Sequence, residues 1–176
     1  MQRSLVFLLL FFAAFVSARV KPSEAVVSLG SGYITGRASS VFTFAGGLSL
    51  VLPSGFSDEI DISLSGIYAR DADYFLPENR AGKYYPYVYG LRLELVFEQP
   101  VSKVISLTGS GGILLLNDRT FSDVNEWGSG LGVSGGAKLY IENTPFSLGI
   151  TASYGLTLTA TTPSYSLFTL NTGYNF

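Results

Sequence analysis

Apolar residues recur at every second position along most of the chain, and this period of two limits the possible folds more than any other feature. The pattern is clearest at residues 85–97, where every odd-numbered residue is tyrosine, leucine or phenylalanine, whereas Gly90, Arg92 and Glu94 occupy even positions. Successive side chains point to opposite faces of a β-strand, so strict alternation predicts strands. We expect eight strands, at residues 25–35, 40–52, 59–70, 85–97, 104–116, 128–141, 146–158 and 166–176.

The two faces of these predicted strands differ in a way that a water-soluble sheet does not explain. One face carries large aliphatic and aromatic side chains, and the other is mainly glycine, serine and threonine. Four charged residues fall inside the eight spans away from the strand ends, all on the small polar face: Asp61, Arg92, Glu94 and Lys138. Glu59 and Arg70 are the two end residues of the third span. A soluble sandwich or barrel would place lysine and glutamate on its solvent face. The apolar face is therefore predicted to contact lipid, and the polar face to line a narrow lumen.

Strand length and edge chemistry then define the architecture. A tilted strand needs about 9–11 residues to cross a bilayer, and the predicted spans have that length or slightly more. An open sheet edge in hydrocarbon would leave backbone groups unpaired, at a cost of several kcal/mol each. The sheet must therefore close on itself. The predicted fold class is all-β, an eight-stranded antiparallel up-and-down transmembrane β-barrel.

The connections between the predicted strands suggest which way the barrel faces. Pro53, Pro100 and Pro145 mark three short turns, and the longer connections at 71–83 and 117–127 lie between them. Proline cannot donate to a strand ladder, so it indicates where strands stop. Short turns on one side and longer loops on the other are typical of outer-membrane barrels. We therefore expect both termini on the short-turn side, in the periplasm.

The first 18 residues have the organisation of a secretory signal peptide. Arg3 precedes an apolar run at residues 5–16, and Val16-Ser17-Ala18 offers small residues for cleavage. A transmembrane helix needs about 20 apolar residues, so this run favours a cleaved signal over an uncleaved anchor helix. We predict a signal peptide at residues 1–18 and a single barrel domain at 19–176.

The last predicted strand carries a family resemblance. Alternating apolar residues that end on Tyr174 and a final Phe176 resemble the carboxyl-terminal sorting signal of bacterial outer-membrane barrels. The whole of residues 19–176 resembles the small eight-stranded OmpX type and the membrane domain of OmpA. The resemblance implies a Gram-negative outer membrane, insertion by the barrel-assembly machinery, and contact with outer-membrane lipid and lipopolysaccharide. The sequence ends at Phe176, so we expect no peptidoglycan-binding domain of the OmpA kind.

The four charges on the polar face allow two interpretations. Confined charges must pair, because leaving them desolvated and unpaired costs several kcal/mol each. Asp61, Arg92, Glu94 and Lys138 are therefore expected to form a salt-bridge plug in a lumen that side chains fill. The alternative is a gated pore, or a carboxylate dyad formed by Asp61 and Glu94.

Composition argues against several other classes of function. The net charge of −2 disfavours nucleic acid. The chain has no cysteine and no histidine, so it lacks thiolate metal sites and the commonest general base. The resembling lipid A deacylase and palmitoyltransferase families use a catalytic histidine. The glycines at 130–135 match G-x-G-x-x-G, but a strand continues where a dinucleotide site needs a helix. We expect no catalytic residues, no cofactor and no metal.

The loops are the expected place for contacts with other molecules. Function in rigid barrels is commonly displayed on loops, and exposed aromatic residues mark the two longer connections: Tyr74, Phe75, Phe121 and Trp127. Acidic loop residues suit divalent cations, although their spacing matches no EF-hand. We predict a structural or surface-interaction role, with an unidentified surface ligand. The alternatives are a narrow channel or lateral-exit transporter for a small or hydrophobic solute and, less favoured, a lipid-modifying enzyme.

Overall fold

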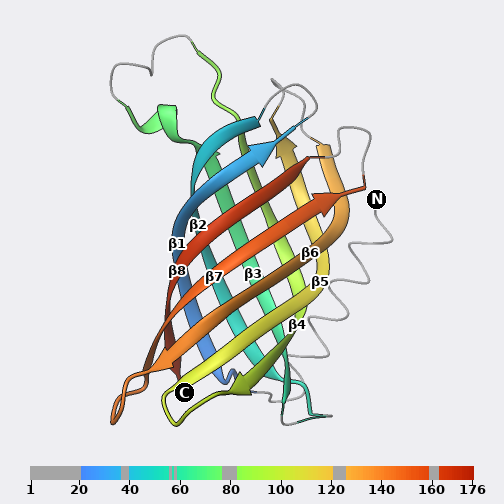
Figure 1. The fold of residues 1–176 in the computed structure, drawn as a ribbon. Coiled ribbons are helices and arrows are strands. Elements are labelled where there is room, and N and C mark those ends of the chain that lie inside the picture. Colours follow the sequence, from blue (N-terminus) through green and yellow to red (C-terminus); the bar gives the residue numbers. More distant parts are fainter. Residues whose placement is uncertain are drawn as a thin grey trace.

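The protein forms a closed barrel of eight antiparallel strands (Figure 1). The computed structural model describes residues 21–36, 40–55, 57, 59–76, 83–120, 126–158 and 163–176. The strands are β1 (Glu24–Thr35), β2 (Ser40–Pro53), β3 (Ile60–Asp71), β4 (Tyr87–Pro100), β5 (Ile105–Arg119), β6 (Glu126–Tyr140), β7 (Phe146–Thr157) and β8 (Ser164–Asn175). A single 3-10 turn, η1 (Ala72–Phe75), follows β3. The predicted signal peptide at residues 1–18 and the loop residue Phe121 lie outside the described residues.

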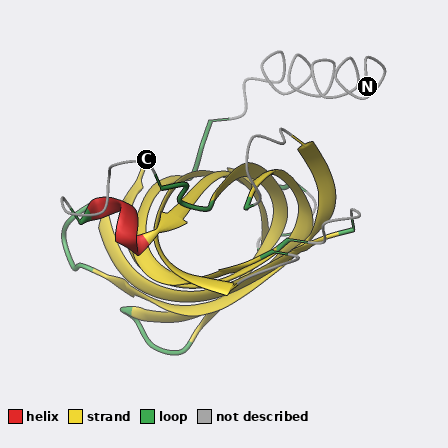
Figure 2. Ribbon diagram, turned by 90° about the horizontal axis from the view of Figure 1, so that it is seen from above, coloured by secondary structure: helices red, strands yellow, loops and turns green. Residues whose placement is uncertain are grey.

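Each strand pairs with its neighbours in the sequence, and the first and last strands close the ring. β1 pairs with β2 on one side and with β8 on the other, so that Glu24 faces Val51 and Asn175. Viewed along the barrel axis, the strands form a continuous ring (Figure 2). This confirms the predicted all-β, eight-stranded, antiparallel up-and-down barrel. Among the described residues, no helix is long and apolar enough to cross a membrane.

The two ends of the barrel differ mainly in one connection. We call the end that holds the connections at 36–39, 72–86, 120–125 and 158–163 the loop end, and the end that holds 54–59, 101–104 and 141–145 the turn end. The chain returns to the turn end at Phe176, whose amide donates to the Ser23 carbonyl (Figure 1). The connection at 72–86 is the longest, and it carries η1. The predicted asymmetry therefore rests on one connection instead of two.

The prediction that residues 117–127 form a long loop is wrong. Asp118 and Arg119 belong to β5, and Trp127 belongs to β6, where it pairs with Asn117. Strand pairing continues there because polar side chains at a barrel rim leave the backbone ladder intact. β4 likewise extends past its predicted end at residue 97 to Pro100, which faces Ser106 of β5.

Large apolar side chains cover the outside of the barrel. Leu29, Leu131 and Leu170 are 67%, 61% and 63% exposed, which is far from the usual burial of leucine. Aromatic rings gather near both ends of this surface. At the loop end Trp127 meets Tyr89 edge to face at 5.4 Å, and at the turn end rings pack in the order Phe146, Tyr174, Phe176. We call this surface the apolar belt.

η1 folds over the outside of the barrel at the loop end (Figure 1). The ring of Phe75 packs edge to face against Phe44 of the apolar belt at 5.7 Å, and Tyr74 packs against Tyr85 at 5.9 Å. Tyr85 was predicted to begin a strand on the outer face. The structure corrects this, because Tyr85 precedes β4 and is only 3% exposed. Pro86 separates it from the ladder, since proline has no amide donor.

Candidate functional site in the barrel lumen

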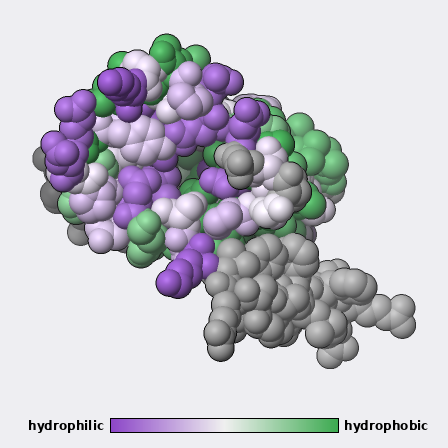
Figure 3. Space-filling view, turned by 90° about the horizontal axis from the view of Figure 1, so that it is seen from below, coloured by the Kyte–Doolittle hydropathy of each residue, from purple (hydrophilic) through white to green (hydrophobic). Residues whose placement is uncertain are grey.

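The inward-facing residues divide the lumen into two parts. Near the loop end the interior is filled by apolar side chains from six strands, which we call the apolar plug: Ile34, Ala45, Ala69, Val88, Leu114, Leu116, Tyr165 and Leu167. Below it, towards the turn end, lies a cavity of about 410 Å³ lined mainly by polar and charged side chains, which we call the charged chamber. Viewed from below, polar residues surround the recess at this end (Figure 3). Apolar side chains thus fill the loop-end half of the lumen, whereas the predicted charges Asp61, Arg92, Glu94 and Lys138 line the cavity towards the turn end.

Tyr165 is the largest fully buried side chain of the apolar plug, with 1% exposure. It comes from β8 and lies opposite Gly155 of β7. A Cβ atom at residue 155 would collide with the Tyr165 ring, so the close approach requires glycine here. The ring thus fills the space that Gly155 leaves open. The hydroxyl group of Tyr165 lies at the end of the apolar plug that faces the charged chamber.

A buried ion pair lies at the boundary between the apolar plug and the charged chamber. Arg92 donates from Nη1 to the Tyr165 hydroxyl at 3.3 Å, and its Nη2 lies 3.3 Å from Oε2 of Glu94. Glu94 also accepts a hydrogen bond from Ser110 at 3.1 Å, and its side chain is 3% exposed. The predicted lumen residues Arg92 and Glu94 are thus brought together. These side-chain contacts offset part of the free-energy cost of burying the two charged groups.

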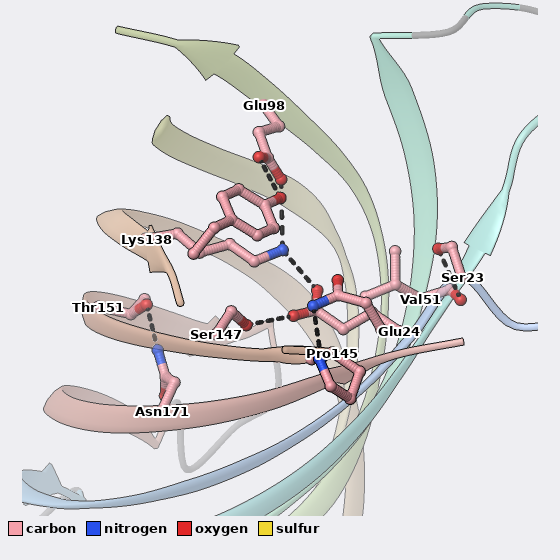
Figure 4. A network of polar contacts seen from close by, with 11 residues as sticks. Ser23, Glu24, Val51, Glu98, Lys138, Pro145, Ser147, Thr151 and Asn171 are labelled. Atoms are coloured by element: carbon pink, nitrogen blue, oxygen red, sulfur yellow. Dashed lines mark hydrogen bonds and ion pairs between the residues drawn. The ribbon is translucent and has the colours of Figure 1, made fainter. Parts of the chain in front are cut away.

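Lys138 forms a separate network inside the charged chamber (Figure 4). Its Nζ lies 2.7 Å from Oε2 of Glu24 on β1 and 3.4 Å from Oε2 of Glu98 on β4. Tyr140 donates its hydroxyl proton to Glu98, and Ser147 donates to Glu24 at 2.8 Å. The network joins β1, β4, β6 and β7 across the lumen. Its position at the turn end places it below the apolar plug.

The four predicted lumen charges therefore do not form one cluster. Asp61 lines the charged chamber but takes part in none of the ion pairs within 4.0 Å among the described residues. The carboxylate of Glu94 is engaged by Arg92 and Ser110, which opposes the alternative of a dyad with Asp61. Within the described ranges no group of three or more acidic side chains is placed to hold a metal ion.

Sequence reasoning missed Glu24 and Glu98, both partners of Lys138. Glu98 lies one residue beyond the predicted strand at 85–97 and before the turn that Pro100 marks, and Glu24 precedes the first predicted strand. A signal for both was present, because Glu98 shares its position in the alternation with Arg92 and Glu94, and Glu24 shares that of the inward-facing Ser28. Extending the alternation by one step at each strand end would have found them.

The other predicted residues that the structure describes lie on the outer surface or at the rims. Tyr174 and the final Phe176, predicted as a sorting signal, are 43% and 73% exposed at the turn end of the apolar belt. Of the loop candidates, Tyr74 and Phe75 lie in η1, and Trp127 lies on the outer face of β6. The glycines at 130–135 form part of β6, which continues as a strand to Tyr140, so the dinucleotide motif lacks its helix.

Comparisons with known proteins agree with this architecture. No family model and no curated protein sequence matches the chain. Neisserial surface protein A matches 87% of this chain and 96% of its own, with a TM-score of 0.69 and 9% identity. The Yersinia pestis attachment invasion locus protein Ail, solved with the heparin analogue sucrose octasulfate, matches 89% of this chain and 100% of its own, with a TM-score of 0.52 and 15% identity. The outer membrane enzyme PagL matches 86% of this chain and 99% of its own, with a TM-score of 0.52 and 16% identity.

The fold is that of the small eight-stranded outer-membrane barrels. This confirms the structural resemblance to the OmpX and OmpA type that the sequence indicated. The matched proteins include surface proteins and an enzyme. Since a fold hosts many functions, the function of this barrel has to be argued from its own residues.

Proposed function

We propose that the protein is a closed scaffold of the bacterial outer membrane, with a structural or surface-interaction role and no catalytic activity. The observation that carries this proposal is the combination of an exposed apolar belt with a lumen occluded at one end. Large apolar side chains such as Leu29 and Leu170 are more than 60% exposed on the outside. Inside, the apolar plug fills the lumen at the loop end.

The orientation of the barrel in the membrane and its assembly follow from the same proposal. Outer-membrane barrels place short turns in the periplasm and longer loops outside the cell. The turn end, with Ser23 and Phe176, would then be periplasmic, and η1 would face the cell surface. Tyr174 and Phe176 at the end of β8 would be read by the barrel-assembly machinery. Lipopolysaccharide and other outer-membrane lipids would surround the apolar belt.

A charge on the apolar belt tests the membrane location. Val133 lies midway along β6 and is 55% exposed. Val133→Arg should destabilise the barrel in lipid vesicles by about 2–4 kcal/mol, the cost of a cation near the bilayer midplane. The measurement is the urea midpoint of unfolding in vesicles, with the folded fraction at each urea concentration read from heat-modifiable gel migration. An unchanged midpoint, or a wild-type chain that stays monomeric and folded in buffer without detergent, would contradict the proposal.

Conductance across a planar bilayer tests the closed lumen. We expect the wild-type barrel to be silent, because the apolar plug fills the path between the charged chamber and the loop end. Steady, discrete openings would instead favour a narrow channel.

One observation favours transport with a lateral exit as a second candidate. The charged chamber and a groove on the outer wall share the wall residues Ser28, Gly46, Gly47, Gly66 and Ile67, so the barrel wall is thin there. A small or hydrophobic solute could leave sideways at this place. Against it, β2 and β3 remain paired through Gly47 and Ile67. Uptake of a hydrophobic dye into vesicles that contain the barrel, above that of empty vesicles, would support this candidate.

The proposed absence of catalysis has a direct test. The outer membrane enzyme PagL shares the fold, but the present chain contains no histidine. Lys138, the lysine nearest Ser134 in the sequence, is bound to Glu24, while Ser134 shares a hydrogen bond with Ser110. A serine needs an adjacent base to act as a nucleophile. Release of fatty acid from lipopolysaccharide or phospholipid by the purified barrel would overturn this part of the proposal.

A further inference from the structure

The apolar belt contains a groove of about 640 Å³ on the outer wall over β1 to β4. Gly46 and Gly66 form its floor, where the neighbouring outward positions carry large side chains. The walls are Leu29, Leu48, Tyr68, Tyr89, Leu91 and Trp127. A Cβ atom at residue 46 or 66 would meet no atom closer than 3.5 Å, so packing does not explain why these positions are glycine. The two glycines leave a furrow between these large side chains.

A cationic side chain lies at the loop-end margin of this groove. Arg70 is on the same outward face of β3 as Gly66 and Tyr68, and its Nη1 donates to the Tyr68 hydroxyl at 3.3 Å. Its guanidinium stacks on the ring of Tyr74 at 3.3 Å and lies 5.1 Å from the ring of Tyr87. These aromatic contacts fix the guanidinium beside the groove.

The charge of Arg70 has no anionic partner in the described structure. None of the ion pairs within 4.0 Å among the described residues includes it, and its Nε is buried without a hydrogen-bond partner. Guanidinium groups in such partly desolvated places normally pair with carboxylate or phosphate, often in a bidentate manner. A fixed cation beside an apolar furrow is complementary to a molecule with an anionic head and a hydrocarbon tail.

We propose that the groove binds a phosphorylated membrane lipid of the loop-end leaflet, with one acyl chain over Gly46 and Gly66 and the phosphate on Arg70. This inference rests on the proposed membrane location. The acyl chain replaces the side chains that the two glycines lack, and the phosphate supplies the missing anion. The lipid would be held more tightly than the bulk lipid around the rest of the apolar belt.

Trp127 gives a direct readout, because it lines the groove and is the only tryptophan of the chain. The folded barrel in a neutral detergent is titrated with phosphatidic acid that carries brominated acyl chains, which quench indole fluorescence on contact. We expect saturable quenching at a low mole fraction of this lipid. Brominated diacylglycerol, which lacks the phosphate, should need a concentration higher by about tenfold or more, the effect of losing one charge-assisted contact.

Matched variants separate the two parts of the site. Arg70→Gln should weaken the binding of brominated phosphatidic acid by about tenfold and leave diacylglycerol unchanged. Gly66→Leu should weaken both lipids by filling the groove. Gly111→Leu is the control, because residue 111 also has open space around its Cβ and lies outside the groove. Inorganic phosphate should not displace the lipid at equal concentration.

The outcome of this titration is distinguishable from failure of the membrane location. A barrel that shows heat-modifiable migration in detergent, yet is quenched equally by both lipids, would overturn the lipid site and leave the proposed function intact. Equal quenching of Gly66→Leu and wild type would overturn it as well. A chain that folds without detergent would instead refute the proposed function itself.

Discussion

Replacement of Lys138 by alanine is expected to destabilise the barrel by about 3–5 kcal/mol, the cost of removing one partner from a buried charge network. Lys138 is 14% exposed and is the cation between Glu24 and Glu98. Without it, these two carboxylates face each other across the charged chamber and keep neutral hydrogen-bond donors such as Ser147 and Tyr140 but no cation. Like-charge repulsion then adds to the desolvation of Glu24. The measurement is the urea midpoint of the folded, heat-modifiable form in detergent.

The control for this prediction is Lys103→Ala. Lys103 is exposed in the turn between β4 and β5, so its loss should change stability by no more than about 0.5 kcal/mol. A Glu24→Gln and Lys138→Ala double-mutant cycle measures the coupling of the pair, since Glu24→Gln removes the charge that Lys138 would leave unpaired. If Lys138→Ala unfolds at the same urea concentration as wild type, the network does not hold the strands together.

The period of two predicted the fold because it reports the one constraint that every strand shares. In each strand, alternate residues must meet either lipid or the lumen, so the pattern at 85–97 reappears around the whole ring. The strand ends were less predictable. Polar residues such as Asp118 and Glu98 are typical of loops. Here they extend the strands, because polar side chains can point into the lumen or lie at the rim of the barrel.

The candidate site was predictable only in part, because alternation gives the face of a residue but not its partner. Arg92 and Glu94 are two residues apart on one strand, and their pairing follows from that spacing. The partners of Lys138 come from β1 and β4, far away in the sequence, and only the curvature of the closed barrel brings them together. The apolar plug was missed because inward leucines such as Leu114 are indistinguishable by residue type from outward ones.

Replacement of Tyr165 by alanine tests whether the apolar plug closes the lumen. The ring is 1% exposed and fills the space beside Gly155, so Tyr165→Ala leaves a void and removes the hydroxyl partner of Arg92. We expect a loss of about 3–5 kcal/mol in the free energy of unfolding, typical of an aromatic residue truncated in a core. Because the void adjoins the charged chamber through Arg92, the variant should also show ion conductance where the wild type is silent.

Two further substitutions identify which property of Tyr165 matters. Tyr165→Phe keeps the ring and removes only the hydrogen bond to Arg92, so it should lose about 1–3 kcal/mol and remain silent in a planar bilayer. Tyr154→Ala makes the same truncation on the outer wall, where the ring is 47% exposed, and it too should remain silent. Conductance in Tyr165→Ala alone would show that the volume of the ring blocks the path. If a folded Tyr165→Ala barrel shows no conductance, the rest of the apolar plug closes the lumen without the Tyr165 ring. If Tyr165→Phe shows channel openings, the hydrogen bond to Arg92 is what closes the lumen.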